Sequence, residues 1–100
     1  EGEDTVKRLR LKNVKNGEKS TLDISGVFVA VGFKPNTGYL KSVLTLTEDG
    51  TIITNEKMET GVPGIFAAGD IRSSSIRQIA AAVGDGAVAA IYAERYIAGK

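Results

Sequence analysis

The chain contains neither cysteine nor histidine among its 100 residues. Without cysteine, these residues hold no disulfide, no thiol nucleophile and no redox dithiol. Without either residue type they cannot form an ordinary zinc or haem site, so we expect no metal. A Ser-His-Asp triad is excluded as well, because it needs a histidine as its base.

The chain also lacks a large excess of positive or negative charge, and it lacks long hydrophobic runs. The chain carries 13 Lys and Arg against 12 Asp and Glu, a net charge of +1, which offers no basic surface to nucleic acid or anionic lipid. No uninterrupted apolar run approaches the length of about 20 residues that a membrane-spanning helix needs. We therefore expect neither nucleic-acid nor membrane partners. The acidic start, from Glu1 to Asp4, is unlike a secretory signal and lacks Met, and we expect the chain to be part of a longer protein.

The first quarter of the chain has the pattern of a β-hairpin. Residues alternate in character from Val6 to Val14 and again from Thr21 to Ser25, which is the period of a half-buried strand. Asn16-Gly17 lies between the two segments and is favoured in tight turns, because both residues tolerate positive φ. The sequence thus predicts a two-stranded antiparallel ribbon.

Two continuous apolar runs are typical of strands that are covered on both faces. The first is Val27 to Val31, which ends at Gly32, and the second is Ile65 to Ala68, which ends at Gly69-Asp70. Between them, Lys34 to Gly38 is rich in turn-forming residues and contains a proline, which cannot continue a hydrogen-bonded ladder. We predict the main domain boundary there, near residue 36.

Apolar residues recur at helical spacing from Ile76 to Ile91 and predict one long C-terminal helix, for which Gly99 would be the stop. We expect Ser73 to Ser75 to provide its N-cap, since a serine hydroxyl can accept a hydrogen bond from a free backbone N–H. Gly84 and Gly86 each cost about 1 kcal/mol relative to alanine inside a helix. The close approach of another backbone or of a ligand would offset that cost.

The segment that runs from the second apolar strand through a loop to the helix is the best candidate for a site. In open α/β sheets, ligands bind beyond the carboxyl ends of the strands. Gly69 lets a ligand approach its backbone, and the Asp70 carboxylate can accept hydrogen bonds from ligand hydroxyls. The helix start at Arg77 to Ile79 presents free N–H groups, which favour an anionic or electron-rich group by about 0.3–1 kcal/mol. Two alternatives stay open on the residues alone: Asp70 caps a turn and the helix end is hydrated, and Arg72 pairs either with a phosphate or with a nearby carboxylate.

Two segments of the chain resemble a known family. Val62 to Asp70, followed by Arg77-Gln78 and by Ala81 to Gly86, resembles the C-terminal FAD-binding segment of low-molecular-weight thioredoxin reductases. Gly26 to Thr37 resembles the segment by which that family leaves its NADPH domain. The order and spacing of these motifs are specific to the pyridine nucleotide-disulfide reductase superfamily, and Arg77-Gln78 indicates its thioredoxin-reductase branch.

The resemblance implies an α/β fold built from partial FAD- and NAD(P)-binding Rossmann-like domains, with a β-hairpin, buried strands and one long C-terminal helix. Residues 1–36 would form the C-terminal end of the NADPH-binding domain. Residues 37–100 would form the C-terminal part of the FAD-binding domain. The family also implies a cytoplasmic homodimer that uses FAD and NADPH and has thioredoxin or a similar redox protein as its partner.

The resemblance further implies roles for individual residues. Asp70 would hydrogen-bond the ribityl–pyrophosphate part of FAD, and Gly69 would allow the cofactor to come close. The backbone around Gln78 and Ile79 would face the N1–C2=O edge of the flavin. Gly32 would lie near the hinge between the domains, with a link to NADPH. The complete set of expected cofactor-binding residues is Gly69, Asp70, Ile71, Arg77, Gln78 and Ile79.

The implied function is that of an FAD-dependent thioredoxin-disulfide reductase, in which electrons pass from NADPH through the flavin to a dithiol outside these residues. The Gly-rich FAD fingerprint, the NADPH fingerprint and the Cys-x-x-Cys of the family are absent from the 100 residues, so we expect no catalytic residue among them. Two alternatives stay open: a ferredoxin–NADP reductase of the same architecture, and a module or piece without catalysis of its own. A Cys-x-x-Cys preceding this segment would favour the thioredoxin-disulfide reductase.

Overall fold

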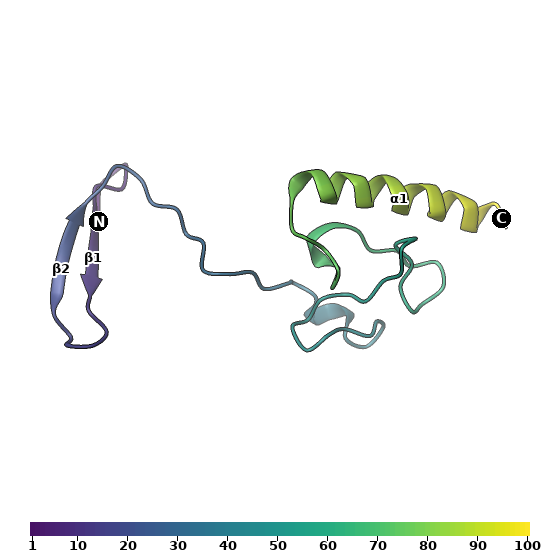
Figure 1. Cartoon of the computed structure of the whole chain (residues 1–100), viewed down its shortest axis with the longest axis horizontal. Helices are drawn as coiled ribbons and strands as arrows, with labels where there is room; N and C mark the ends of the chain where they lie inside the picture. The colour runs from purple at the N-terminus through teal and green to yellow at the C-terminus, as the bar shows by residue number, and fades with distance from the viewer. The chain divides into compact units, whose positions relative to one another are not determined.

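The computed structural model describes all 100 residues, from Glu1 to Lys100. The chain forms two compact units, Glu1–Gly32 and Phe33–Lys100. The fold class is α/β, as expected, with a β-hairpin in the first unit and one long helix in the second (Figure 1). The boundary between the two units, after Gly32, lies a few residues before the domain boundary that the sequence predicts near residue 36. The assignment of the units to an NADPH domain and an FAD domain stays a prediction.

The predicted hairpin is confirmed. Strand β1 (Arg8–Lys12) pairs antiparallel with strand β2 (Lys19–Asp23). The connecting turn closes with a hydrogen bond of 2.8 Å from the Gly17 N–H to the Asn13 carbonyl, and Gly17 has a φ of 76°. A positive φ at this position is readily adopted by glycine, which explains the turn.

The expected buried strand at Val27–Val31 is not formed within this chain. The segment belongs to neither strand of the sheet, and its side chains are open to solvent, with Phe28 101% and Val31 91% exposed. A strand needs a neighbour that takes its backbone N–H and C=O groups, and no other segment of these 100 residues pairs with this one. The prediction of a buried strand is therefore wrong for the chain by itself. Gly32, which ends the run, has a φ of 121°, in the region that favours glycine.

The second unit is built mainly from loops that are joined by single bridges around a small core. The core consists of Leu44, Ile52 and Ala67, against which further half-buried side chains pack. Ile52 bridges to two segments, antiparallel to Leu46 and parallel to Arg72. In the bridge to Arg72, the Ile52 N–H donates to the Ile71 carbonyl (2.8 Å) and the Ile52 carbonyl accepts from the Ser73 N–H (2.9 Å).

The strand expected at Ile65–Ala68 is likewise reduced to one bridge, between Phe66 and Glu59. A turn precedes it, closed by a hydrogen bond of 3.1 Å from the Ile65 N–H to the Val62 carbonyl. The turn leaves only a short stretch of backbone available for pairing. This part of the prediction is correct about burial at Ala67 and wrong about an extended strand.

The predicted helix is present as α1, Ile79–Ile97 (Figure 1). The helix ends at Ile97, with Ala98 as its C-cap, and the predicted stop residue Gly99 follows directly. Gly99 has a φ of 71°, and the Lys100 N–H donates to the Arg95 carbonyl at 2.8 Å, so the glycine closes the last turn. Near this end the Tyr96 ring meets the Phe66 ring edge to face, with centroids 6.3 Å apart.

The serines do not cap this helix, contrary to the prediction. Its N-cap is Gln78, in extended conformation and without a side-chain hydrogen bond to the helix. The Ser75 hydroxyl accepts from the Arg77 N–H (3.1 Å), and the Ser74 hydroxyl accepts from the Arg72 guanidinium (3.0 Å). The helix starts late because Arg77 has a φ of 56°, which is outside the right-handed helical region.

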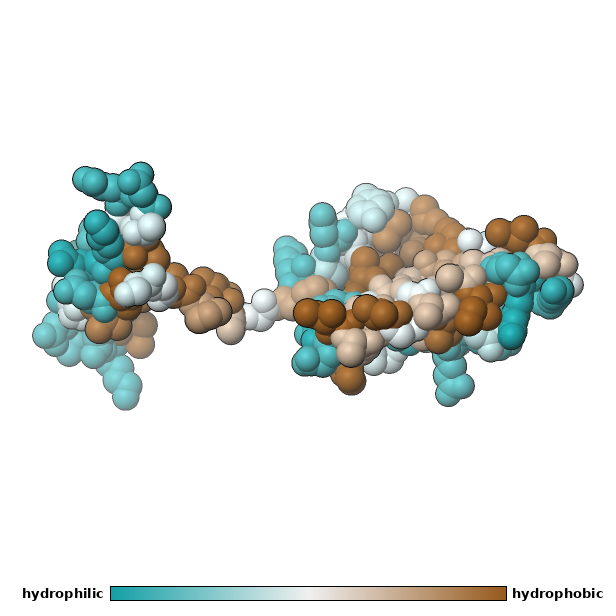
Figure 2. All heavy atoms as spheres, turned by 90° about the horizontal axis from the view of Figure 1, so that it is seen from above, coloured by the Kyte–Doolittle hydropathy of each residue, from teal (hydrophilic) through white to brown (hydrophobic).

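Much of the apolar surface of α1 is uncovered within the chain. No residue of the helix is buried, and Ile79 and Val83 are 87% and 69% exposed. A Cβ added at Gly84 or Gly86 would meet nothing within 4 Å, so the close neighbour expected at these glycines does not lie among these residues. Figure 2 shows apolar side chains, in brown, on the molecular surface. No helix in the structure combines the length and hydropathy required to cross a membrane.

Candidate functional site

The short 3-10 helix η2, Gly69–Ile71, lies against α1 and carries the first candidate residues. Gly69 is buried and has a φ of 82°, and a Cβ built on it would lie 3.4 Å from the Cβ of Ala82. The Gly69 N–H donates to Oδ2 of Asp85 at 3.0 Å. Because both contacts are made with α1, they fix η2 beside the first two turns of that helix.

The Asp70 carboxylate has no partner within the chain. Its side chain is exposed, and its carboxylate takes part in none of the three ion pairs of the chain. No side-chain cap stabilises η2, so the alternative in which Asp70 caps a turn does not hold. The group is available as a hydrogen-bond acceptor for a ligand.

The start of α1 presents free backbone donors. The first hydrogen bond of the helix runs from the Ala82 N–H to the Gln78 carbonyl at 3.0 Å. The N–H groups of Ile79 to Ala81 therefore have no acceptor within the helix. No acidic residue lies in the first turn, so the positive end of the helix dipole is not compensated by the chain.

The structure places the two remaining candidates differently. The Arg77 guanidinium lies over the Phe33 ring, 4.5 Å from the ring centroid, which is a cation–π contact within the second unit. Ile71 is half-buried and packs against the core. Gly69, Asp70 and the start of α1 are thus brought together, whereas Ile71 has a packing role. The cofactor roles of all these residues stay predictions.

Arg72 and Asp85 form an ion pair next to η2, and Asp85 was not among the residues predicted for the site. Arg72 is 8% exposed, and its Nη1 donates to Oδ2 of Asp85 at 2.6 Å. Its Nε donates to the Thr54 hydroxyl at 2.7 Å and its Nη2 to the Ser74 hydroxyl at 3.0 Å. The structure thereby settles the open choice for Arg72 in favour of a carboxylate of the same chain.

The sequence did contain a signal for this pair. Asp85 is the only charged residue between Ile79 and Ala93, a stretch made otherwise of apolar residues, glycine and one tyrosine. Charges in such a setting are seldom buried unless they are paired. This pattern indicates a cationic partner for Asp85, and the two arginines that precede the helix most closely are Arg77 and Arg72.

The environment of Asp85 keeps it ionised. The hydrogen bond from Arg72 lowers the pKa of the Asp85 carboxyl below its ordinary value, while burial acts in the opposite direction. The Gly69 N–H and the positive charge of Arg72 lower it further. Two donors therefore meet a carboxylate that is negatively charged at neutral pH.

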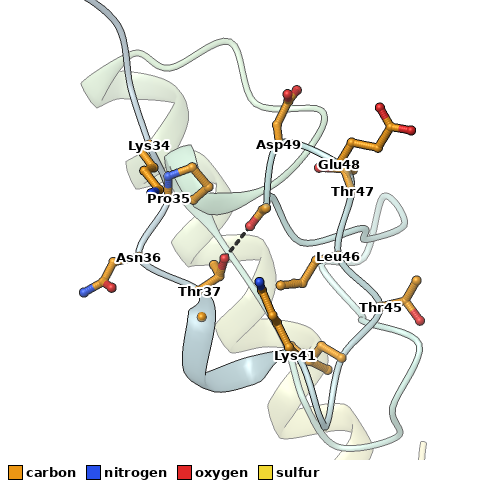
Figure 3. A pocket seen from close by; sticks show the side chains of 13 residues that line it. Lys34, Pro35, Asn36, Thr37, Lys41, Thr45, Leu46, Thr47, Glu48 and Asp49 are labelled. Atoms are coloured by element: carbon orange, nitrogen blue, oxygen red, sulfur yellow. Dashed lines mark hydrogen bonds between the residues drawn. The ribbon is translucent and has the colours of Figure 1, made fainter.

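A separate pocket of about 780 Å³ opens in the loops before the core (Figure 3). One side is held by a hydrogen bond of 2.5 Å from the buried Thr37 hydroxyl to the Gly50 carbonyl. None of the expected cofactor-binding residues lines it. Its charged lining residues are Lys34, Lys41, Glu48 and Asp49. Because the two signs are balanced, the lining indicates no preference for a charged ligand.

The comparison with protein families identifies the class of protein to which this chain belongs. The family model described as pyridine nucleotide-disulphide oxidoreductase matches residues 1–86. The chain therefore belongs to the pyridine nucleotide-disulphide oxidoreductase family.

Individual relatives are similar over nearly the whole chain. The chain is 46% identical over 99 residues to the "34.2 kDa protein in rubredoxin operon" of Clostridium pasteurianum, covering 99% of this chain and 32% of that protein. It is 43% identical over 97 residues to the thioredoxin reductase of Chlamydia pneumoniae, covering 96% of this chain and 31% of the relative. It is also 43% identical over 96 residues to a subunit of the alkyl hydroperoxide reductase of Staphylococcus aureus, covering 96% of this chain and 19% of the relative.

The solved structures that resemble this chain include thioredoxin reductases as well. The thioredoxin reductase of Streptococcus pyogenes matches 100% of this chain and 33% of its own, with a TM-score of 0.79 and 40% identity. The thioredoxin reductase of Lactococcus lactis matches the same shares with a TM-score of 0.71 and 40% identity. The expected resemblance to thioredoxin reductases and their Rossmann-like fold is thus confirmed. The chain spans about a third of the length of the thioredoxin reductases it matches.

Proposed function

We propose that this chain contributes part of the flavin site of an FAD-dependent thioredoxin-disulfide reductase. The observation that carries the proposal is the placement of Asp70 on η2, which packs through Gly69 onto α1 close to the free N–H groups of its first turn. An acceptor for hydroxyl groups and a donor surface for an electron-rich group thus lie on one compact unit. Relatives named thioredoxin reductase support the choice of enzyme.

The residues present fit FAD in their chemistry. The exposed Asp70 carboxylate is an acceptor and carries negative charge, so it suits the hydroxyls of the ribityl chain better than a phosphate oxygen. The free N–H groups at Ile79 to Ala81 suit the N1–C2=O edge of the flavin. Gly69 cannot carry a side chain without strain in its observed conformation, and its missing side chain faces Ala82, so it lets η2 pack closely on α1 beside the start of that helix.

When bound, the flavin would accept a hydride from NADPH and pass electrons to a dithiol or disulfide outside these residues. The chain's own contribution is electrostatic and steric. Negative charge that develops near N1 would be stabilised by the N-terminal end of α1, by about 0.3–1 kcal/mol and up to ~2 kcal/mol in a partly buried site. The exposed Ile79 side chain at the same end would exclude water once it is covered.

The proposal extends to the rest of the enzyme through the family resemblance. Residues 1–36 would close the NADPH-binding domain and residues 37–100 the FAD-binding domain, with Gly32 near the hinge. The φ of 121° at Gly32 is compatible with a hinge, because glycine moves between backbone regions at low cost. The complete reductase would be a cytoplasmic homodimer, and its partner would be thioredoxin or a similar redox protein.

We expect parts of the full-length protein other than this chain to determine which electron acceptor is used. The same 43% identity is found with a thioredoxin reductase and with a subunit of an alkyl hydroperoxide reductase. Assays of NADPH-dependent reduction with thioredoxin and with ferredoxin as alternative acceptors would separate the proposed enzyme from a ferredoxin–NADP reductase of the same architecture.

The flavin site itself is tested by Asp70→Ala in the full-length protein that carries this chain. We expect the variant to bind FAD about ten- to a hundredfold more weakly, because hydrogen bonds to a charged acceptor are lost. Quenching of flavin fluorescence on titration of the apoprotein measures the change. Asp49→Ala is the matched control, since it removes another exposed carboxylate that lies on the separate pocket. An unchanged FAD affinity in Asp70→Ala would contradict the proposal.

A further inference from the structure

One carboxylate oxygen on α1 accepts two hydrogen bonds from the segment that carries Asp70. Oδ2 of Asp85 on α1 accepts from the Gly69 N–H at 3.0 Å and from Nη1 of Arg72 at 2.6 Å. Gly69 and Arg72 lie on either side of Asp70 in the chain. Asp85 therefore holds both ends of the short segment that presents the Asp70 carboxylate.

Arg72 connects this contact to the rest of the unit. Besides Asp85, its guanidinium donates to the hydroxyls of Thr54 and Ser74, and its backbone N–H donates to the Gly69 carbonyl at 3.1 Å. The Ile71 carbonyl is bound as well, by the Ile52 N–H. Both residues next to Asp70 are thus tied to the core or to α1, while the Asp70 side chain itself is free.

We propose that Arg72 and Asp85 are positioning residues for FAD, which act by holding the backbone of η2 so that the Asp70 carboxylate is preorganised for the ribityl hydroxyls. The inference rests on the proposed function and deepens it. It assigns a role to two residues that would not touch the cofactor.

A role in positioning explains the pair better than a role in stability alone. Taking two charges out of water is costly, and replacing a buried ion pair by apolar residues is often neutral or stabilising. A guanidinium that is bound by three side chains, by contrast, has one well-defined orientation, because its donors form a rigid planar fork. A rigid η2 lowers the ordering cost when a ligand binds, which increases affinity without any additional contact.

The test is a double-mutant cycle in the full-length protein, with FAD affinity of the apoprotein and its thermal midpoint as separate readouts. Asp85→Asn keeps the size of the side chain and removes its charge. We expect it to weaken FAD binding about tenfold in the presence of Asp70 and to have almost no further effect on FAD binding in an Asp70→Ala background. The thermal midpoint should fall by the same amount in both backgrounds, because the structural contact is lost in each.

Asp23→Asn is the control for the loss of a carboxylate charge, since it breaks the exposed Arg8–Asp23 pair of the hairpin. It should leave FAD affinity unchanged. If Asp85→Asn does not yield folded protein, Thr54→Val replaces it in the cycle. That change removes only the Nε partner of Arg72 and should show a smaller loss with the same dependence on Asp70.

Equal losses of FAD affinity in both backgrounds would overturn the positioning role and leave the proposed flavin site intact. A lack of effect of Asp70→Ala by itself would overturn both, because there would be no carboxylate to position. The two failures are therefore distinguishable within one set of variants.

Discussion

The backbone conformation of Gly69 favours glycine. Its φ of 82° is in the left-handed region, whereas an added Cβ would make only an ordinary contact with the Cβ of Ala82, at 3.4 Å. The left-handed conformation costs a non-glycine residue about 1–2 kcal/mol. We therefore expect Gly69→Ala to lower the free energy of unfolding by about that amount, measured as a lower denaturation midpoint of α1 by circular dichroism. Gly99→Ala, at a second positive-φ glycine with open space around it, should show a similar backbone cost.

Helix α1 contains two glycines whose surroundings are open in this chain. Gly84 has helical backbone and nothing within 4 Å of an added Cβ. Gly84→Ala should stabilise α1 in the 100-residue chain by about 1 kcal/mol, because alanine loses less backbone entropy. The helical signal in circular dichroism, followed against temperature, measures the change. If another backbone of the full-length protein packs closely on this face, as the sequence predicts, the same substitution should destabilise the full-length protein. Stabilisation in both would contradict a close neighbour at Gly84.

The link between η2 and α1 is expected to weaken in acid. The pKa of Asp85 is lowered in the folded chain from an ordinary value of 3.8, chiefly by the hydrogen bond from Arg72. A lowered pKa means that the unfolded state takes up the proton more readily. The stabilisation is therefore complete above about pH 4 and is lost as the pH falls through the lower pKa of the folded state.

Asp85→Asn measures this contribution directly. The variant should be less stable than the unsubstituted chain at pH 7, and the difference between the two should shrink as the pH is lowered below the ordinary pKa of 3.8. Midpoints of urea denaturation across this range provide the comparison. Asp23→Asn, from an exposed ion pair, should change the profile little. A difference that stays constant with pH would show that charge is not what Asp85 contributes.

The molecule as a whole leaves many large hydrophobic side chains exposed. Only four hydrophobic residues are buried: Leu44, Ile52, Met58 and Ala67. Val27–Val31 and the outer face of α1 are uncovered. We expect the 100-residue chain to melt broadly, to bind hydrophobic dyes and to retain little or no FAD, because the other half of the proposed site lies elsewhere. Calorimetry and dialysis against FAD measure these properties. A sharp two-state melt, or near-stoichiometric FAD retention, would contradict this expectation.

Local pattern was enough to predict several elements of this protein. The alternation on either side of Asn16-Gly17 predicted the hairpin, and the apolar periodicity and Gly99 predicted the long helix and its end. The motif around Gly69-Asp70 and Arg77-Gln78 predicted the family. In each case neighbouring residues determine the outcome, through turn conformation, side-chain period or a short motif.

Other features depend on residues that are far apart in the sequence. The apolar pattern of Val27–Val31 describes a strand correctly only when a partner strand is present, and the chain contains none. The serines could cap a helix, but the positive φ of Arg77 moves the helix start to Ile79. The partner of Arg72 was decided by the packing of η2 on α1, which brings Asp85 within 2.6 Å. The sequence determined which groups are available and what they can bind, whereas the tertiary structure decided which of them meet, because burial and pairing depend on segments that local chemistry does not bring together.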